Sequence, residues 1–315
     1  MKFSDVDGDG MEEFIVVEYT ESYPKQSIAT VSRWLLDGTR VVEQASQPLR
    51  GDRLLVGNID HDPLDEVVLF GRDVLLILDW QGAGYQLFES DACAGGGRPW
   101  ARVGALLDID GDGRKEIVLG TVDPRGDDGA DPTTLVFCRF DSGIDVLFEW
   151  PLANGIQTLA GGDLTDNGRD EIVTEEASSD GTVVGQLTIY QVDADAGVEQ
   201  IYKRNRGVDR ANFLGVVEVG GVPLLVVDGI GAWPSISLAR LQHSSAGFDL
   251  IPQRLDRFER TWAAIRSTMA YSAERRAYVR FNDRRAPDVI RVDEELRPAE
   301  MLGHEDLRAD RLTRP

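Results

Sequence analysis

Short apolar runs separated by polar turns make up most of this chain. The runs are rich in Val, Ile, Leu, Thr and aromatic residues, and they turn at Gly, Asp or Ser, as β-strands joined in hairpins do. Helical periodicity is scarce: residues 255–269 alone would also fit a helix, and their alternation fits a strand about as well. The pattern therefore predicts an all-β fold.

An acidic segment recurs along the chain, each time directly before an apolar run. Four copies align without gaps: DVDGDGMEE from residue 5, NIDHDPLDE from 58, DIDGDGRKE from 108 and DLTDNGRDE from 163. Successive copies start about 50 residues apart. Continuing at this interval predicts further repeats near residues 218 and 272, where paired apolar runs occur without the acidic segment. Self-similarity at a fixed period of this size indicates an array of like structural units.

Each repeat also holds a second pair of apolar runs after the acidic segment. Four short strands in a unit of about 50 residues are typical of a β-propeller blade. We therefore predict one all-β β-propeller domain over residues 1–303, with six blades, or seven if one is shared or missing. The predicted repeats lie near 1–50, 51–99, 100–152, 153–207, 208–257 and 258–303, and a polar C-terminal tail follows at 304–315.

The acidic segments have the composition of calcium-binding loops. Calcium takes about six to eight oxygen ligands, and carboxylates at alternate positions 1, 3 and 5 of a tight loop converge on one point. Glycine at position 6 permits the positive φ that the turn needs, position 7 offers its backbone carbonyl, and an acid at position 9 closes the site. We number loop 1 (5–13), loop 2 (58–66), loop 3 (108–116) and loop 4 (163–171) in this way.

The predicted ligands are the residues at positions 1, 3, 5, 7 and 9 of each loop. They are Asp5, Asp7, Asp9, Met11 and Glu13 in loop 1, Asn58, Asp60, Asp62, Leu64 and Glu66 in loop 2, Asp108, Asp110, Asp112, Arg114 and Glu116 in loop 3, and Asp163, Thr165, Asn167, Arg169 and Glu171 in loop 4. An EF-hand would need a carboxylate at position 12, where loops 1 and 3 have Val16 and Leu119. The sequence therefore excludes an EF-hand.

The four loops differ in how complete they are. Loops 1 and 3 have every acidic ligand, whereas loop 2 begins with Asn58 and has Pro63 at position 6, where the fixed φ of proline requires a different turn. Loop 4 replaces two acids with Thr165 and Asn167. Because ligand charge tunes calcium affinity, we predict up to four calcium ions, bound most tightly by loops 1 and 3, less tightly by loop 2, and most weakly by loop 4.

These loops resemble the FG-GAP/VCBS repeats of integrin-type β-propellers, in which a D-x-D-x-D-G-x-x-D/E loop joins the first two strands of a blade. The resemblance covers most of the chain in architecture, but its diagnostic residues are those of the four loops. It implies calcium at the blade rim, a propeller of usually seven blades, and extracellular adhesion or carbohydrate-associated roles. We therefore expect a non-enzymatic interaction or adhesion scaffold at an extracellular or cell-surface location; a lectin or a polysaccharide-active enzyme on the same propeller is the alternative.

Charge narrows the choice of partner. The chain has 55 acidic and 33 basic residues, a net charge of −22, which repels nucleic acids and anionic membranes. We therefore predict a protein or glycan partner, no nucleic acid and no membrane insertion. No apolar run reaches the roughly 18 residues of a membrane helix, and no signal peptide is evident; loop 1 begins so close to Met1 that we expect an upstream segment.

Few residues outside the loops suggest chemistry. His61, His243 and His304 are scattered, no HExxH or GxSxG motif occurs, and no catalytic residue is predicted. Cys93 and Cys138 could pair with each other or remain free thiols. The tryptophans, among them Trp80 and Trp150, fit packing at strand ends, with stacking on a sugar as the alternative.

Overall fold

The structure is a computed structural model, and its description covers most of the first 252 residues and part of the remainder. The described residues are 2–10, 12–19, 27–34, 41–49, 53–71, 74–82, 84–90, 100–122, 133–177, 185–193, 197–204, 211–219, 222–229, 235–245, 247–252, 270–272, 277–282, 285–292 and 298–302. Cys93, the candidate helix at 255–269 and the predicted tail at 304–315 lie outside these ranges.

The described residues form strands and no helix, and the strands make six four-stranded antiparallel sheets. The first three sheets are β1 (Lys2–Ser4), β2 (Glu13–Tyr19), β3 (Ser27–Trp34) and β4 (Val41–Leu49); β5 (Arg53–Gly57), β6 (Glu66–Gly71), β7 (Val74–Trp80) and β8 (Tyr85–Ser90); and β9 (Trp100–Leu107), β10 (Glu116–Val122), β11 (Thr133–Phe140) and β12 (Ile144–Pro151).

The last three sheets have the same simple up-and-down order. They are β13 (Gly155–Gly162), β14 (Glu171–Ala177), β15 (Gln186–Asp193) and β16 (Gly197–Arg204); β17 (Ala211–Val219), β18 (Val222–Gly229), β19 (Ser235–Ser244) and β20 (Gly247–Pro252); and β21 (Ala270–Ser272), β22 (Ala277–Asn282), β23 (Arg285–Val292) and β24 (Pro298–Leu302). Each sheet lies within one of the repeats read from the sequence, including the two repeats that have no acidic loop.

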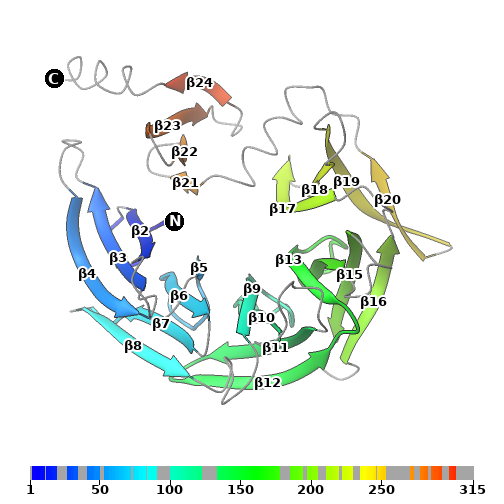
Figure 1. The fold of residues 1–315 in the computed structure, drawn as a ribbon, viewed down its shortest axis with the longest axis horizontal. Coiled ribbons are helices and arrows are strands. Elements are labelled where there is room, and N and C mark those ends of the chain that lie inside the picture. The colour runs from blue at the N-terminus through cyan, green and yellow to red at the C-terminus, as the bar shows by residue number, and fades with distance from the viewer. Residues whose placement is uncertain are drawn as a thin grey trace.

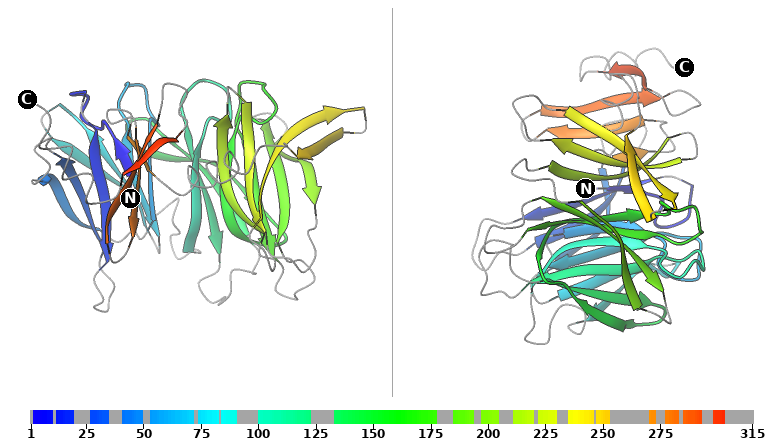
Figure 2. Two further views of the ribbon diagram at one scale, coloured as in Figure 1. Left: turned by 90° about the horizontal axis from the view of Figure 1, so that it is seen from above. Right: turned by 90° about the vertical axis from the view of Figure 1, so that its right-hand side faces the viewer.

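Consecutive sheets stand side by side around a central space, each with its first strand innermost (Figure 1). These inner strands contact one another in the series β1–β5, β5–β9, β9–β13 and β13–β17, and β1 also contacts β21. Figure 2 shows the strands running between two rims that carry the connecting loops. The all-β class and the repeated four-stranded unit are therefore confirmed, whereas closure into a propeller stays a prediction.

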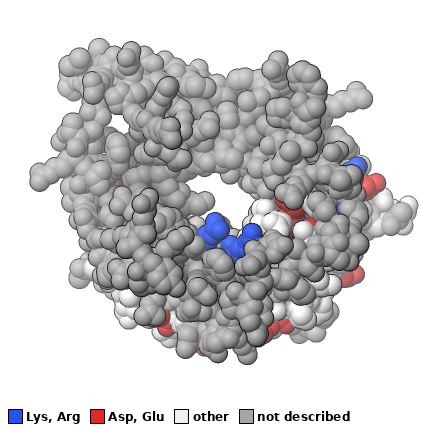
Figure 3. Space-filling view, in the orientation of Figure 1, with Lys and Arg blue, Asp and Glu red and all other residues white. Residues whose placement is uncertain are grey.

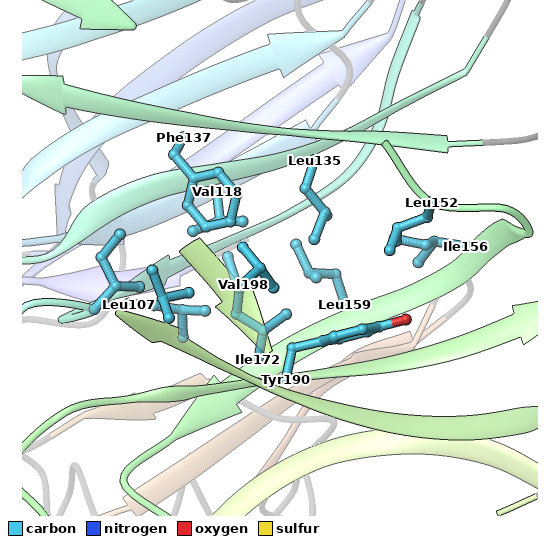
Figure 4. Close-up of a cluster of buried hydrophobic side chains, with 13 residues drawn as sticks. Leu107, Val118, Leu135, Phe137, Leu152, Ile156, Leu159, Ile172, Tyr190 and Val198 are labelled. Atoms are coloured by element: carbon cyan, nitrogen blue, oxygen red, sulfur yellow. The ribbon is translucent and has the colours of Figure 1, made fainter. Parts of the chain in front are cut away.

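The core lies between neighbouring sheets. The second strands β6 and β14 are buried along nearly their whole length, while every residue of the outer strands β8 and β12 is exposed or only partly buried. This is expected when the middle of a sheet is covered on both faces. Figure 4 shows side chains of the third and fourth sheets pointing toward each other, among them Phe137, Leu159 and Ile172. This packing fixes the position of each second strand, on which every acidic loop ends.

Candidate metal centres

All four acidic loops join the first two strands of a sheet. Loop 1 connects β1 to β2, loop 2 connects β5 to β6, loop 3 connects β9 to β10, and loop 4 connects β13 to β14. Position 9 of each loop is the first residue of the second strand, so the closing glutamate is held by the sheet rather than by the loop.

The closing glutamate braces its own loop from inside the core. Its side chain is at most 1% exposed in all four loops, and its Oε2 accepts the backbone N–H of position 2 in each. The four hydrogen bonds are Val6 N to Glu13 (2.9 Å), Ile59 N to Glu66 (2.8 Å), Ile109 N to Glu116 (3.2 Å) and Leu164 N to Glu171 (2.7 Å). Position 2 is itself a buried apolar residue, so the loop is anchored at both ends.

Position 1 organises the turn in loops 1, 3 and 4. Its carboxylate accepts the N–H of position 6, from Gly10 to Asp5 (2.9 Å), from Gly113 to Asp108 (2.9 Å) and from Gly168 to Asp163 (2.8 Å). Those three glycines have φ of 84°, 90° and 79°, a conformation that a side chain disfavours. The glycine at position 6 is therefore required by the backbone, as the sequence indicated.

Loop 2 is wound differently, as Pro63 predicted. Pro63 and His61 do not have positive φ, and the Asn58 amide Nδ2 donates to the carbonyl of Asp62 instead of accepting from position 6. The Asp62 N–H donates to Asp60 Oδ1 (2.7 Å), and Asp62 Oδ1 accepts the Leu64 N–H (2.8 Å). The two aspartates are thus held by their own turn.

Three of the loops bring together carboxylates that could hold a metal ion. In each group, one oxygen per residue lies within 4.8 Å of the others. The groups are Asp5, Asp7 and Glu13; Asp60, Asp62 and Asp79; and Asp108, Asp110 and Glu116. Loop 4 forms no such group among the described residues. The predicted ligands Asp9, Asn58, Glu66, Asp112 and Asp163 belong to none of the three groups. Of the predicted carbonyl ligands, Met11 lies outside the described residues.

Loop 2 gathers buried negative charge. Glu66 is fully buried and its Oε1 has no hydrogen-bond partner. Burial, followed by repulsion from Asp60, Asp62 and Asp79, raises the pKa of Glu66 from 4.5 to about 8. Burial likewise raises the pKa of Asp79, and its Oδ1 has no partner either. Asp79, on the third strand of the sheet, was not among the residues predicted from the sequence.

Two arginines offset part of the negative charge of loop 3. Arg139, on β11, donates through Nε (3.1 Å) and Nη2 (2.7 Å) to Glu116 Oε1, and through Nη2 to Asp110 Oδ2. Arg114 donates from Nη2 to Asp112 Oδ2 (2.7 Å); burial alone would raise the pKa of Asp112, but these hydrogen bonds from Arg114 hold it below its usual value. Three of the four predicted acidic ligands of loop 3 therefore already have a cationic partner.

Loop 4 satisfies its closing glutamate with neutral donors. Glu171 Oε1 accepts the hydroxyl of Thr165 (2.7 Å) and the amide of Asn167 (3.3 Å), and its Oε2 also accepts the Thr165 N–H (3.0 Å). Burial raises the pKa of Glu171. The two residues that dilute the charge of loop 4 are thus the ones that fill the hydrogen-bonding capacity of its glutamate.

Neighbouring loops touch one another in a repeated way. Gly8, at position 4 of loop 1, packs closely against Leu64, at position 7 of loop 2: a Cβ added to Gly8 would lie only 2.7 Å from the Leu64 side chain. Gly111 and Arg169 are the same pair in loops 3 and 4, where an added Cβ would lie 3.2 Å from the Arg169 side chain. In the same way His61, position 4 of loop 2, meets Arg114, position 7 of loop 3: His61 Nε2 lies 3.1 Å from Arg114 Nη1. The backbone also bridges loops 3 and 4, from the Asp170 N–H to the carbonyl of Asp108 (2.7 Å). The loops therefore form one continuous row.

The other sequence candidates have ordinary surroundings. His61 lies 3.2 Å from Asp141, and the ring of His243 packs edge-on against Phe248; His304 lies outside the described residues. Cys138 is buried and disulfide-bonded, and Cys93 is the one other cysteine of the chain. The part of the chain that the structure describes includes no helix suited to crossing a membrane.

Comparison with known proteins does not assign this chain to a family. No protein-family model matches this chain, and no curated protein matches it.

Proposed function

We propose that this chain is a calcium-stabilised β-propeller that acts as a non-enzymatic interaction scaffold. The six sheets would be its blades, and the contacts of β1 with both β5 and β21 support a ring in which the first and last blades are neighbours. Its candidate cation sites would be loops 1 to 3, which gather carboxylates between the first two strands of their blades. The resemblance to FG-GAP/VCBS repeats supports the same function.

The observation that carries the proposal is buried carboxylate oxygen without a partner. Asp5 Oδ1, Glu66 Oε1 and Asp79 Oδ1 are all buried and accept no hydrogen bond, and each belongs to a residue beside other carboxylates. Burying an unpaired charge is costly unless a counter-charge enters with it. Several oxygen ligands with no nitrogen or sulfur among them suit a hard cation such as calcium.

Calcium would be structural in such a protein. It would neutralise the converging carboxylates and tie each loop to the strand that follows. Melting of the protein in EDTA and in millimolar calcium tests this, because a ligand present at 100 times its Kd adds about 2.7 kcal/mol per site to the free energy of unfolding. We expect a rise in Tm of several degrees with calcium and a smaller one with magnesium, which holds its water more firmly. A Tm that calcium leaves unchanged would exclude the structural role.

The role as an extracellular scaffold has separate support. The buried disulfide at Cys138 suits an oxidising compartment, and free calcium is abundant outside cells. Outer strands β8 and β12 leave Leu87, Val146 and Leu147 exposed, which offers a protein partner apolar surface beside exposed acids. Figure 3 shows both basic and acidic atoms next to the central hollow.

A further inference from the structure

One position of the third strand faces the closing glutamate of each loop. The register of β10 and β11 pairs Ile117 with Cys138, so the next position sets Arg139 beside Glu116, in agreement with their hydrogen bonds. The register of β6 and β7 places Asp79 beside Glu66 in the same way. We call this the facing position; it is Arg33 in loop 1, Asp79 in loop 2, Arg139 in loop 3 and Gln191 in loop 4.

In loop 2 the facing residue adds a negative charge to a buried negative site. Asp79 is 3% exposed and Glu66 is fully buried, and each has one carboxylate oxygen with no partner. The other oxygen of Asp79 accepts the amide of Gln81. Asp60 and Asp62 complete a group whose oxygens lie within 4.8 Å of that of Asp79. Three carboxylates thus converge, and Glu66, which their negative charge repels, lies beside them with an unsatisfied buried oxygen. A divalent cation supplies the positive charge that this group lacks.

In loop 3 the facing residue supplies the positive charge itself. The guanidinium of Arg139 joins the carboxylates of Asp110 and Glu116, two of the three residues of that loop that could hold a metal ion. A guanidinium stays protonated at every pH at which the protein is folded. It therefore offsets part of the negative charge of the loop at every such pH, and a calcium ion that entered would have to displace it from Asp110 and Glu116.

We propose that the facing position decides which loops take an ion: Asp79 makes loop 2 the principal divalent-cation site, with Asp60, Asp62, Glu66 and Asp79 as its oxygen ligands, whereas Arg139 holds loop 3 together without one. This proposal rests on the proposed function, since it assumes that the loops bind calcium at all, and it names which of them does so most tightly. It reverses the order read from the sequence, in which loop 3 ranked above loop 2.

Calorimetric titration of the EDTA-stripped full chain with calcium chloride tests the proposal. We expect Asp79→Asn to weaken the tightest site at least tenfold, which corresponds to about 1.4 kcal/mol. Asp249→Asn, the same change at an exposed position of β20, should leave the titration unchanged. We expect Arg139→Gln to bind one calcium ion more than the unmodified protein, because it exposes the carboxylates of loop 3.

Melting in EDTA separates lost binding from lost folding. Asp79→Asn removes a buried repulsion, so its Tm in EDTA should equal or exceed that of the unmodified protein, and calcium should raise it less. Arg139→Gln should melt earlier in EDTA and recover with calcium. If the unmodified protein binds calcium and Asp79→Asn binds it with the same affinity, the assignment of loop 2 is wrong while the proposed function stands. If the unmodified protein binds no calcium at about 10 mM, far above the Kd of extracellular calcium modules, both the assignment and the proposed function are wrong.

Discussion

The calcium-free protein should lose stability as the pH rises, and Glu66 should account for much of the loss. An unfolded chain releases the Glu66 proton near pH 4.5, whereas the folded protein keeps it until about pH 8. Between these values the native state binds the proton and the unfolded state does not. The free energy of unfolding therefore falls by about 1.4 kcal/mol for each pH unit, and by about 5 kcal/mol at most over the whole interval.

Urea denaturation in EDTA at pH 5, 6, 7 and 8 measures this loss. In Glu66→Gln the side chain is neutral throughout, so the slope of stability against pH should become shallower by about 1.4 kcal/mol per unit. Burial also raises the pKa of Asp79, Glu116 and Glu171, so a residual slope of the same sign should persist. Glu199→Gln, at an exposed position of β16, is the matched control and should retain the full slope.

Two results would refute this reasoning. One is a calcium-free stability that rises from pH 5 to pH 8, and the other is a Glu66→Gln curve parallel to that of the unmodified protein. Saturating calcium supplies an internal check, because the ion competes with the proton for the same oxygens. Calcium should therefore add more stability at pH 8 than at pH 5, and an equal gain at both would mean that the ion does not bind at Glu66.

Two further substitutions test the packing behind the loops. In Gly161→Ala the new methyl would lie 2.2 Å from the carbonyl oxygen of Glu171, so urea denaturation should show a loss of about 1–3 kcal/mol, whereas Gly143→Ala, with nothing within 4 Å, should show almost none. Tyr190→Phe removes the hydroxyl that donates to buried Glu176 (2.6 Å) and should cost about 1–3 kcal/mol; a loss below about 0.5 kcal/mol would mean that the remaining donors suffice.

The strands and the loops were predictable because both are local. Alternating or continuous apolar runs mark strands, and Asp and Gly at fixed offsets mark a turn whose backbone only they suit. Hence the strands on either side of residues 220–221 could be placed even without an acidic loop, and β17 and β18 lie there. Pro63 correctly indicated that loop 2 is wound differently.

The side chains that face the closing glutamates could not be predicted from the loop residues alone. Asp79 and Arg139 lie 13 and 23 positions beyond the closing glutamates that they face, and their distance from the loop differs because the connections between strands differ in length. Only the register of the third strand brings them to the site. Aligning the third strands with one another, with Asp79, Arg139 and Gln191 in one column, is the signal by which the sequence could have revealed them.

The closing glutamate has two tasks, and separating them explains why four loops with one pattern need not be four metal sites. Its Oε2 accepts the N–H of position 2 in every loop, a brace that needs no ion, so a glutamate at position 9 is required by the fold alone. Its Oε1 is satisfied by Arg139 in loop 3, by Thr165 in loop 4, and by nothing in loop 2. We therefore expect the metal requirement of a loop to follow from the partner of this second oxygen, and not from the number of acids in the motif.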